Sequence, residues 1–325
     1  MKVSEIVKAS GVSRSTVFRF LRGENVRAGA KMAIIAAMEQ LGGVNEFAVN
    51  KQMKLELEIS ASHDLEQFSG FARVVDGIMN ATNEKGITVS IVRRDGEKSA
   101  QDYPAWDHGK LGVIIIGKGM EDECREEELL CQHNIPHVFI NRMMENSKSS
   151  FVSVDVSDAA CALTRHLVEK GCKRIAITGD VKKLRIDRDK IAGYKKGLQE
   201  AGIPFDPGLC LEDVPKEQLE ERLTALLSEN EKPDAYLGIC DTHAMLFVSV
   251  AERFGFEVPS DIMVAGMDDV PTSEMFRPSL TTVHIPFYEM GVLAVDALLK
   301  QTNQDVKSVR EVLNYHLVER ESCLR

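Results

Sequence analysis

The sequence of 325 residues lacks long apolar runs and paired cysteine motifs, and we expect no leader segment. Its apolar stretches, such as the one inside LGVIIIG (111–117), are far shorter than the roughly 18 residues that a membrane span needs. The N-terminal MKVSEIVKAS has no signal-peptide apolar region. The seven cysteines are odd in number and form no CxxC pair, which indicates reduced thiols rather than a disulfide scaffold. We therefore expect a globular, cytoplasmic protein.

Motifs for catalysis and for metal or nucleotide binding are also missing. Gly112–Lys118 has the spacing of a phosphate loop, but its four intervening residues are apolar and Gly119 replaces the required Ser or Thr. His133 and His137 are separated by Pro136, and the cysteines match no zinc spacing. The sequence contains no G-x-S-x-G. We expect no enzyme activity, no cofactor and no metal site.

Charge is distributed unevenly along the chain. The formal net charge is -10, yet residues 1–53 carry eight Lys or Arg and only four Glu, a net charge of +4 that leaves -14 on the remainder. A small basic segment on a large acidic body indicates that the segment contacts a polyanion, although chance clustering would give the same numbers.

The sequence pattern of the basic segment favours contact with a polyanion over chance clustering of charge. Three short helices are expected, one starting near Ile6, a second capped by Ser13 and running to Leu21, and a third with Ile34, Met38 and Leu41 on one face. The linking SGVS turn gives a helix-turn-helix signature. Val17 and Leu21 should face the core, which directs the basic side of the second helix outward toward a DNA major groove.

Two kinds of DNA contact are expected from this segment. Arg14, Ser15 and Arg19 should read base edges, whereas Arg22, Lys31 and Lys51 should contact phosphates. The full expected set of DNA-contacting residues is Arg14, Ser15, Thr16, Phe18, Arg19, Arg22, Lys31, Lys51 and Met53.

The rest of the chain alternates apolar strand patterns with helical patterns. Strands are expected in LELEIS, ITVSIVRR, LGVIIIG, IPHVFIN, FVSVD, RIAITGD, DAYLGIC and DIMVAGMDD. Such alternation predicts parallel sheets built from βαβ units. About ten strands exceed one comfortable sheet, so two similar lobes with a cleft are expected, with ligands at the carboxyl ends of the strands.

KVSEIVKASGVSRSTVFRFLRG (2–23) resembles the DNA-binding head of the LacI/GalR family of bacterial transcriptional regulators. VPSDIMVAGMDDVPTSEMFRPSLTTVHIPFYEMGVLAVDALL (258–299) resembles the effector-domain core of that family, and LVERES (317–322) its closing strand. The resemblance covers nearly the whole chain and implies a helix-turn-helix domain followed by a two-lobed, periplasmic-binding-protein-like (type I) domain, an α/β fold. It also implies a repressor that binds operator DNA as a homodimer or tetramer and responds to a sugar-like effector.

The resemblance also sets the expected domain boundaries. We expect a DNA-binding domain at 1–45, a linker at 46–54 and an effector-binding, dimerising domain at 55–325. Lobe one should comprise 55–157 plus 286–310, and lobe two 158–285 plus 311–325. The segment VVDGIMN (74–80) should form dimer contacts or internal core packing.

Effector-site residues follow from the resemblance only where this sequence matches it. Asp268 should accept hydrogen bonds from ligand hydroxyls or cap a helix, and Phe71 should pack on the ligand or in the core. Lys190 stands in place of an arginine, and Cys240 replaces the asparagine of an Asn-Asp pair. The full expected set is Phe71, Asn141, Arg188, Lys190, Cys240, Asp241 and Asp268.

Several positions depart from the family pattern. The linker GGVNEFAVNKQMK (42–54) has neither the family's proline nor its leucine, leaving Met53 as a minor-groove wedge or an ordinary linker residue. Phe18 replaces a usual serine. Lys190 near Arg185 and Arg188 suggests an anionic effector such as a sugar phosphate or uronate, or a solvated charged helix start. A sugar-binding transport protein or a sugar-metabolism enzyme of similar body fold is the alternative function.

Overall fold

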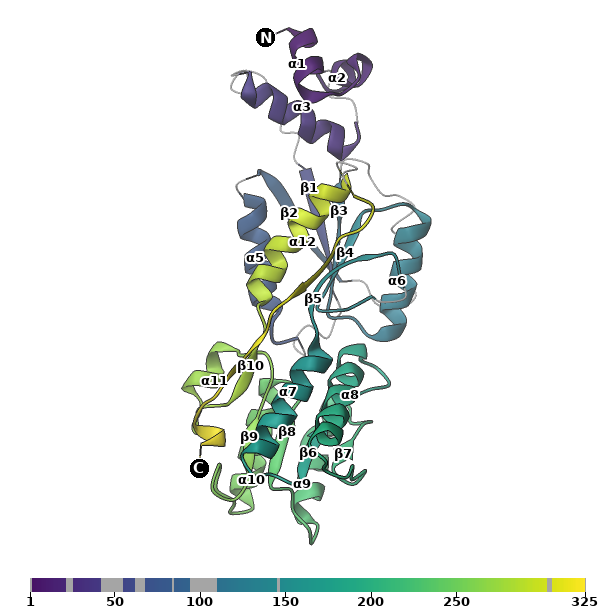
Figure 1. Cartoon of the computed structure of the whole chain (residues 1–325). Helices are drawn as coiled ribbons and strands as arrows, with labels where there is room; N and C mark the ends of the chain where they lie inside the picture. The colour runs from purple at the N-terminus through teal and green to yellow at the C-terminus, as the bar shows by residue number, and fades with distance from the viewer. Residues whose placement is uncertain are drawn as a thin grey trace.

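The computed structural model describes residues 2–21, 26–41, 55–61, 68–83, 85–93, 110–144, 147–302 and 306–324. Within these ranges the chain forms a helical N-terminal head (residues 2–41) followed by two α/β lobes, arranged end to end (Figure 1). The expected fold class is confirmed. The expected linker 46–54 lies outside the described residues. None of the helices in the described ranges is both long and apolar enough to cross a bilayer.

The head consists of α1 (Val3–Ser10), α2 (Arg14–Leu21) and α3 (Ala28–Gln40). Gly11, with φ 66°, ends α1, and its N–H donates to the Val7 carbonyl. The Ser13 hydroxyl accepts from the Thr16 N–H at 3.3 Å, so the expected cap of α2 is confirmed. α1 and α2, joined by this short turn and in contact with each other, form a helix-turn-helix unit.

The core of the head differs in detail from the expected one. Its buried members are Ile6, Val17, Phe20, Val26, Ile34 and Met38. Leu21 is half-buried at its edge, and Phe20 takes the buried position beside Val17. The expectation for Leu41 was wrong: its side chain is 41% exposed because α3 ends at Gln40, before Leu41 reaches the core.

Lobe one is built on a parallel sheet of order β11-β5-β4-β3-β1-β2. Successive residues of β3 point to opposite faces, with Ile114 and Ile116 in one core cluster and Val113 and Ile115 in another. Helices cover both faces, which explains the continuous apolar run of this strand. The elements are β1 (Leu55–Ala61), α5 (Phe71–Asn83), β2 (Ile87–Arg93), β3 (Lys110–Ile116), α6 (Met120–Gln132), β4 (His137–Ile140), β5 (Ser150–Val154), α12 (Phe287–Thr302) and β11 (Arg310–Leu313).

Lobe two repeats this design around a parallel sheet of order β7-β6-β8-β9. On β8, Leu237 packs in the cluster that includes α7 and α8, while Tyr236 packs in the cluster of α9 and α10. The elements are α7 (Val156–Glu169), β6 (Ile175–Thr178), α8 (Arg185–Glu200), β7 (Cys210–Leu211), η4 (Lys216–Gln218), α9 (Leu219–Ser228), β8 (Ala235–Gly238), α10 (Asp241–Arg253), β9 (Met263–Ala265), α11 (Pro271–Met275) and η5 (Glu321–Cys323).

The chain crosses between the lobes three times. The crossings are the step from β5 to α7 and the segments around the antiparallel pair β10 (Thr282–His284) and β12 (His316–Val318). One expected boundary needs correction: β11 continues to Leu313, so residues 311–313 belong to the sheet of lobe one. The reason is its parallel pairing with β5, which satisfies the backbone groups at that edge of the sheet.

Helices α5 and α12 cross at unusually close range. A Cβ on Gly291 would lie 2.2 Å from the Val74 carbonyl oxygen, and one on Gly77 would lie 2.1 Å from the Tyr288 carbonyl oxygen. Val74 and Ile78 are buried at this crossing, whereas Met79 is 50% exposed. Val74, Gly77 and Ile78 of VVDGIMN therefore serve internal packing, whereas Asp76, Met79 and Asn80 are exposed.

We predict that Gly291→Ala destabilises the chain by about 1–3 kcal/mol, because the added methyl group must push α12 away from α5. Urea unfolding at equilibrium measures this change. Gln199→Ala, at an exposed position of α8, should change the free energy of unfolding by less than about 0.5 kcal/mol. Equal stabilities for wild type and Gly291→Ala would show that the two helices are not held at this distance.

Candidate functional site

The exposed side of α2 carries the residues expected to contact base edges. Arg14, Ser15, Phe18 and Arg19 are all exposed, while Val17 on the opposite side is fully buried. The Arg14 guanidinium lies 5.7 Å from the centre of the Phe18 ring. Thr16 is half-buried, with its hydroxyl 2.8 Å from Ser13 Oγ. The core contacts of Val17 thus aim a basic surface at solvent.

Of the residues expected to contact phosphates, only Lys31 lies in the described part of the chain. Its side chain is 6% exposed, so in this structure it does not present a free charge to a duplex. At 100° per residue Lys31 lies between Met38 and Ala28 around α3, and the burial of both neighbours accounts for its low exposure. Arg22, Lys51 and Met53 lie outside the described residues.

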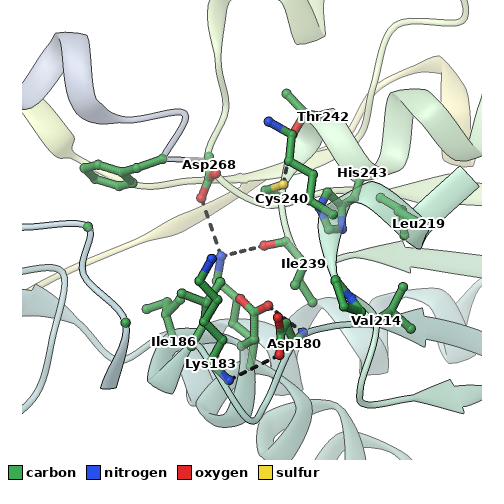
Figure 2. Close-up of a pocket in the computed structure, with 18 of the residues that line it drawn as sticks. Asp180, Lys183, Ile186, Val214, Leu219, Ile239, Cys240, Thr242, His243 and Asp268 are labelled. Atoms are coloured by element: carbon green, nitrogen blue, oxygen red, sulfur yellow. Dashed lines mark hydrogen bonds and ion pairs between the residues drawn. The ribbon is translucent and has the colours of Figure 1, made fainter. Parts of the chain in front are cut away.

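A cavity of about 530 Å³ lies between the two lobes. It is bounded by the segments that follow strands β3 and β4 of lobe one and β6, β8 and β9 of lobe two, so the carboxyl ends of both sheets face the same space. Figure 2 shows Asp268 on one side, Cys240, Thr242 and His243 on another, and Asp180, Lys183 and Ile186 on a third. Four of the expected effector residues line it: Asn141, Lys190, Cys240 and Asp268.

Lys190 and Asp268 form the charged centre of the cavity. Lys190 Nζ donates to the Ile239 carbonyl at 2.5 Å and lies 3.7 Å from Asp268 Oδ1 (Figure 2). The Ser69 hydroxyl, from lobe one, donates to Asp268 Oδ2. Burial raises the pKa of Asp268, and the Lys190 charge and the Ser69 hydroxyl act against that rise. The charge of the Lys190 ammonium group is therefore balanced by the Asp268 carboxylate, and the group is hydrogen-bonded to the Ile239 carbonyl oxygen.

Two polar atoms of the cavity wall have no hydrogen-bond partner within the described ranges: Asn141 Oδ1 and His243 Nδ1. Burial, followed by the charges of Lys190 and Lys216, lowers the pKa of His243 to about 4, which keeps the ring neutral at pH 7. Buried polar atoms without partners are costly and rare in folded proteins, so each requires an explanation. A polar ligand in the cavity would supply both missing partners.

Two cavity residues adopt left-handed backbone conformations that side chains rarely take. Asn141, after β4, has φ 58°, and Asp268, after β9, has φ 118°. Such strain persists only where the surrounding structure enforces it, and it concentrates at binding sites. Here it turns both side chains toward the space between the lobes.

Asp187 and Cys240 complete the polar wall. Asp187 Oδ2 accepts from the Asp180 N–H at 2.9 Å, and burial raises the pKa of Asp187 to about 6. Burial also raises the pKa of the Cys240 thiol to about 12, so this cysteine is neutral and serves as a small lining group.

Three expected effector residues lie elsewhere. Phe71 packs against the core of lobe one, and Phe68, one helical turn earlier, lines the cavity instead. Phe68 is held by an edge-to-face contact with Phe287, with ring centres 5.2 Å apart. Arg188 borders a separate groove of about 500 Å³ beside the junction of the lobes, because it is on the outer side of α8.

Asp241 is the third exception, and its role is structural. It is 0% exposed and accepts hydrogen bonds from the Val270 N–H and from the hydroxyls of Ser273 and Thr282. These bonds fix the loop that carries Asp268. Asp241 therefore supports the cavity wall from behind. Cys240, which replaces the asparagine of the family's Asn-Asp pair, is the residue that lines the cavity.

The lobes touch directly around the cavity. The Met120 N–H donates to the Lys183 carbonyl at 2.9 Å, and Arg185 Nε lies 3.3 Å from Glu123 Oε1. Glu123 is buried and also pairs with Arg142. These contacts and the Ser69 to Asp268 bond must break if the lobes separate, so this structure is a closed arrangement.

Sequence reasoning missed Phe68, Asp187 and His243. Phe68 is the other aromatic residue of FSGF (68–71), but nothing in the sequence indicated which of the two phenylalanines lines the cavity. His243 stands in the first turn of α10, and only the fold shows that this turn faces the cavity. Across the described ranges, no cluster of three His, Cys, Asp or Glu residues is arranged to hold a metal.

Comparison with known proteins gives consistent relatives over the whole chain. Residues 164–323 match the periplasmic binding protein-like domain family. The chain is 26% identical to the HTH-type transcriptional regulator RegA of Clostridium saccharobutylicum, covering 99% of both chains. It is 25% identical to catabolite control protein A of Priestia megaterium, covering 98% of this chain and 97% of that protein.

Solved structures of similar fold include complete regulators. The complex of the transcriptional regulator CelR with cellobiose has a TM-score of 0.75 at 24% identity, covering 99% of each chain. The lac repressor dimer bound to operator and an anti-inducer has a TM-score of 0.71 at 24% identity, covering 100% of this chain and 99% of that one. These relatives are transcriptional regulators and not enzymes.

We predict that Asp187 makes the stability of the chain depend on pH between about 4 and 6. Its folded pKa of about 6 lies above the ordinary 3.8, so the folded state keeps a proton that the unfolded chain releases. This stabilisation is complete below pH 4 and is lost as the pH rises through 6. Asp187→Asn should remove about 3 kcal/mol of the pH-dependent change, as a shift of about two units implies.

Urea unfolding from pH 4 to pH 7 tests this prediction. The control variant is Asp296→Asn, an exposed carboxylate on α12, which should keep the pH dependence of the wild type. If Asp187→Asn and the wild type lose stability in parallel, Asp187 is not protonated in the folded chain.

Proposed function

We propose that the chain is a cytoplasmic repressor of the LacI/GalR kind, which binds DNA and is gated by a small hydroxyl-rich effector; its similarity to curated regulators over nearly its whole length supports this proposal. The effector binds in the cavity between the lobes. The head of each protomer binds one half of an operator. The observation that carries the effector assignment is the pair of unsatisfied atoms, Asn141 Oδ1 and His243 Nδ1, in a cavity that both lobes line.

The chemistry of the cavity favours a neutral, sugar-like molecule. Sugar hydroxyls both donate and accept, which suits the Asp268 carboxylate, the Asn141 carbonyl oxygen and the neutral His243 ring. Phe68 offers an aromatic face for the apolar side of a sugar ring. Lys190 is already paired with Asp268 and the Ile239 carbonyl, so it gives no unbalanced positive charge for a phosphate or a uronate. Cellobiose in the structurally similar CelR is consistent with this class of ligand.

DNA binding is assigned to the exposed side of α2. Arginine can hold guanine O6 and N7 with two hydrogen bonds, and Arg14 and Arg19 both project from this side. One recognition helix in each protomer implies a homodimer on a two-fold symmetric operator. Exposed Met79 on α5 lies where dimer contacts are expected. The effector would change the relative position of the lobes and so the fit of the two heads.

We predict that the chain selects a symmetric duplex from a random-sequence library, and that binding weakens steeply with salt. Arg19→Ala should lower discrimination at one base position of each half-site by about 1–3 kcal/mol. Mobility shifts with the selected duplex and its single-base variants measure this loss. Arg253→Ala, a surface arginine of lobe two paired with Glu220, is the control and should bind like wild type. Failure to select any duplex in dilute salt would refute the DNA assignment.

A second prediction concerns the effector. Melting temperatures measured with neutral sugars, sugar phosphates and uronates should rise with a neutral sugar, by a shift equivalent to about 2.7 kcal/mol at 100 times the Kd. Asp268→Asn should reduce the shift in melting temperature, because a neutral amide replaces a carboxylate that accepts hydrogen bonds from the ligand hydroxyls. Asp296→Asn, far from the cavity, should keep it. Stabilisation by phosphates or uronates alone would show that the effector is anionic.

A further inference from the structure

Helix α3 is apolar on two sides, and each side packs on a different body. Ile34 and Met38 are buried in the core of the head. Ala28, which is 4% exposed, and half-buried Met32 pack instead in the main hydrophobic cluster of the lobes. At 100° per residue the two pairs lie about 120° apart around the helix. A helix with only one partner would carry polar residues on its second side.

The second side of α3 meets the end of lobe one that carries the first residues of β3 and the last turns of α12. α3 contacts β3 and α12 as well as α1 and α2. Leu111, Leu298 and Leu299 belong to the same cluster as Ala28. In Figure 1, α3 lies over the end of lobe one at which β1 and β3 begin.

We propose that Ala28 and Met32 form a docking face that attaches the head to lobe one, so that lobe one carries the head as a rigid extension. The 13 residues of 42–54 could span up to about 45 Å when extended, so the covalent link alone does not fix the head. Packing of α3 supplies the missing constraint. It also explains why α3 begins with Ala28 and Gly29 after Arg27, which is not a capping residue: the first turn is adapted to a neighbouring surface.

Rigid attachment has a consequence for DNA binding. Two heads held at a fixed separation meet two half-sites at little entropic cost, but only at one spacing. Freely tethered heads would tolerate several spacings. A change in the position of lobe one would then reach the head directly through α3.

The test is Ala28→Glu in the full chain, with Ala36→Glu as the matched control. Both add one carboxylate to α3, but Ala28 is buried and Ala36 is exposed. A glutamate in the first turn of a helix is favourable for the helix itself, so the change acts on the docking contact. Amide hydrogen exchange should become at least about tenfold faster at the start of α3 and at the end of α12 in Ala28→Glu. Ala36→Glu should exchange like wild type.

Three outcomes decide the proposal. Faster exchange in Ala28→Glu alone, with α1 and α2 still protected, supports it. Equal exchange in Ala28→Glu, Ala36→Glu and wild type overturns it. If Ala28→Glu also exposes α1 and α2, Met32→Ser replaces it, since Met32 packs on lobe one and not on the core of the head. The same two results then support or overturn the proposal.

A second measurement uses the duplex selected by the wild type. Inserting two base pairs between its half-sites should weaken wild type and Ala36→Glu at least about tenfold, and Ala28→Glu much less. Equal sensitivity to spacing in all three proteins would overturn rigid attachment. If the wild type selects no duplex, the proposed function fails, while the exchange experiment, which contains no DNA, still decides the docking face.

Discussion

The structure depends on one constraint: two parallel sheets present their carboxyl ends to the same gap. Parallel strands require crossover helices, and these helices bury both faces of each sheet, so the loops after the strands bring polar groups to the junction. Asn141, Ile239 and Asp268 come from three such loops. Asn141 and Asp268, both with positive φ, and the unsatisfied atoms Asn141 Oδ1 and His243 Nδ1 thus meet in one cavity.

The fold was largely predictable because its signals are local. Apolar runs separated by helical patterns identified most strands, and the Gly11 turn with the Ser13 cap identified the helix-turn-helix unit. The β11 strand was missed as part of lobe one because REVL is short and half polar, and only its pairing with β5 assigns it to that sheet. The prediction for Leu41 was wrong for a related reason: the apolar pattern of the sequence continues past Gln40, where α3 ends.

The cavity was predictable only in part, because its residues come from distant segments. Asn141, Lys190, Cys240 and Asp268 stand at strand ends or on the helix that faces the gap, and they line the cavity as expected. Arg188 is two residues from Lys190, yet a rotation of about 200° on a helix places it in another groove. Asp241 and Lys31 show the opposite error, since charged side chains expected to meet ligands are buried.

The proposed function requires that an effector bound in this cavity changes the affinity of the head for DNA. The most direct measurement is the Kd of the stabilising effector, by calorimetry, with and without the selected duplex, together with the Kd of the duplex with and without effector. Coupling between two sites is reciprocal, so the account predicts that both affinities change by one common factor. An effector affinity that the duplex leaves unchanged would contradict it.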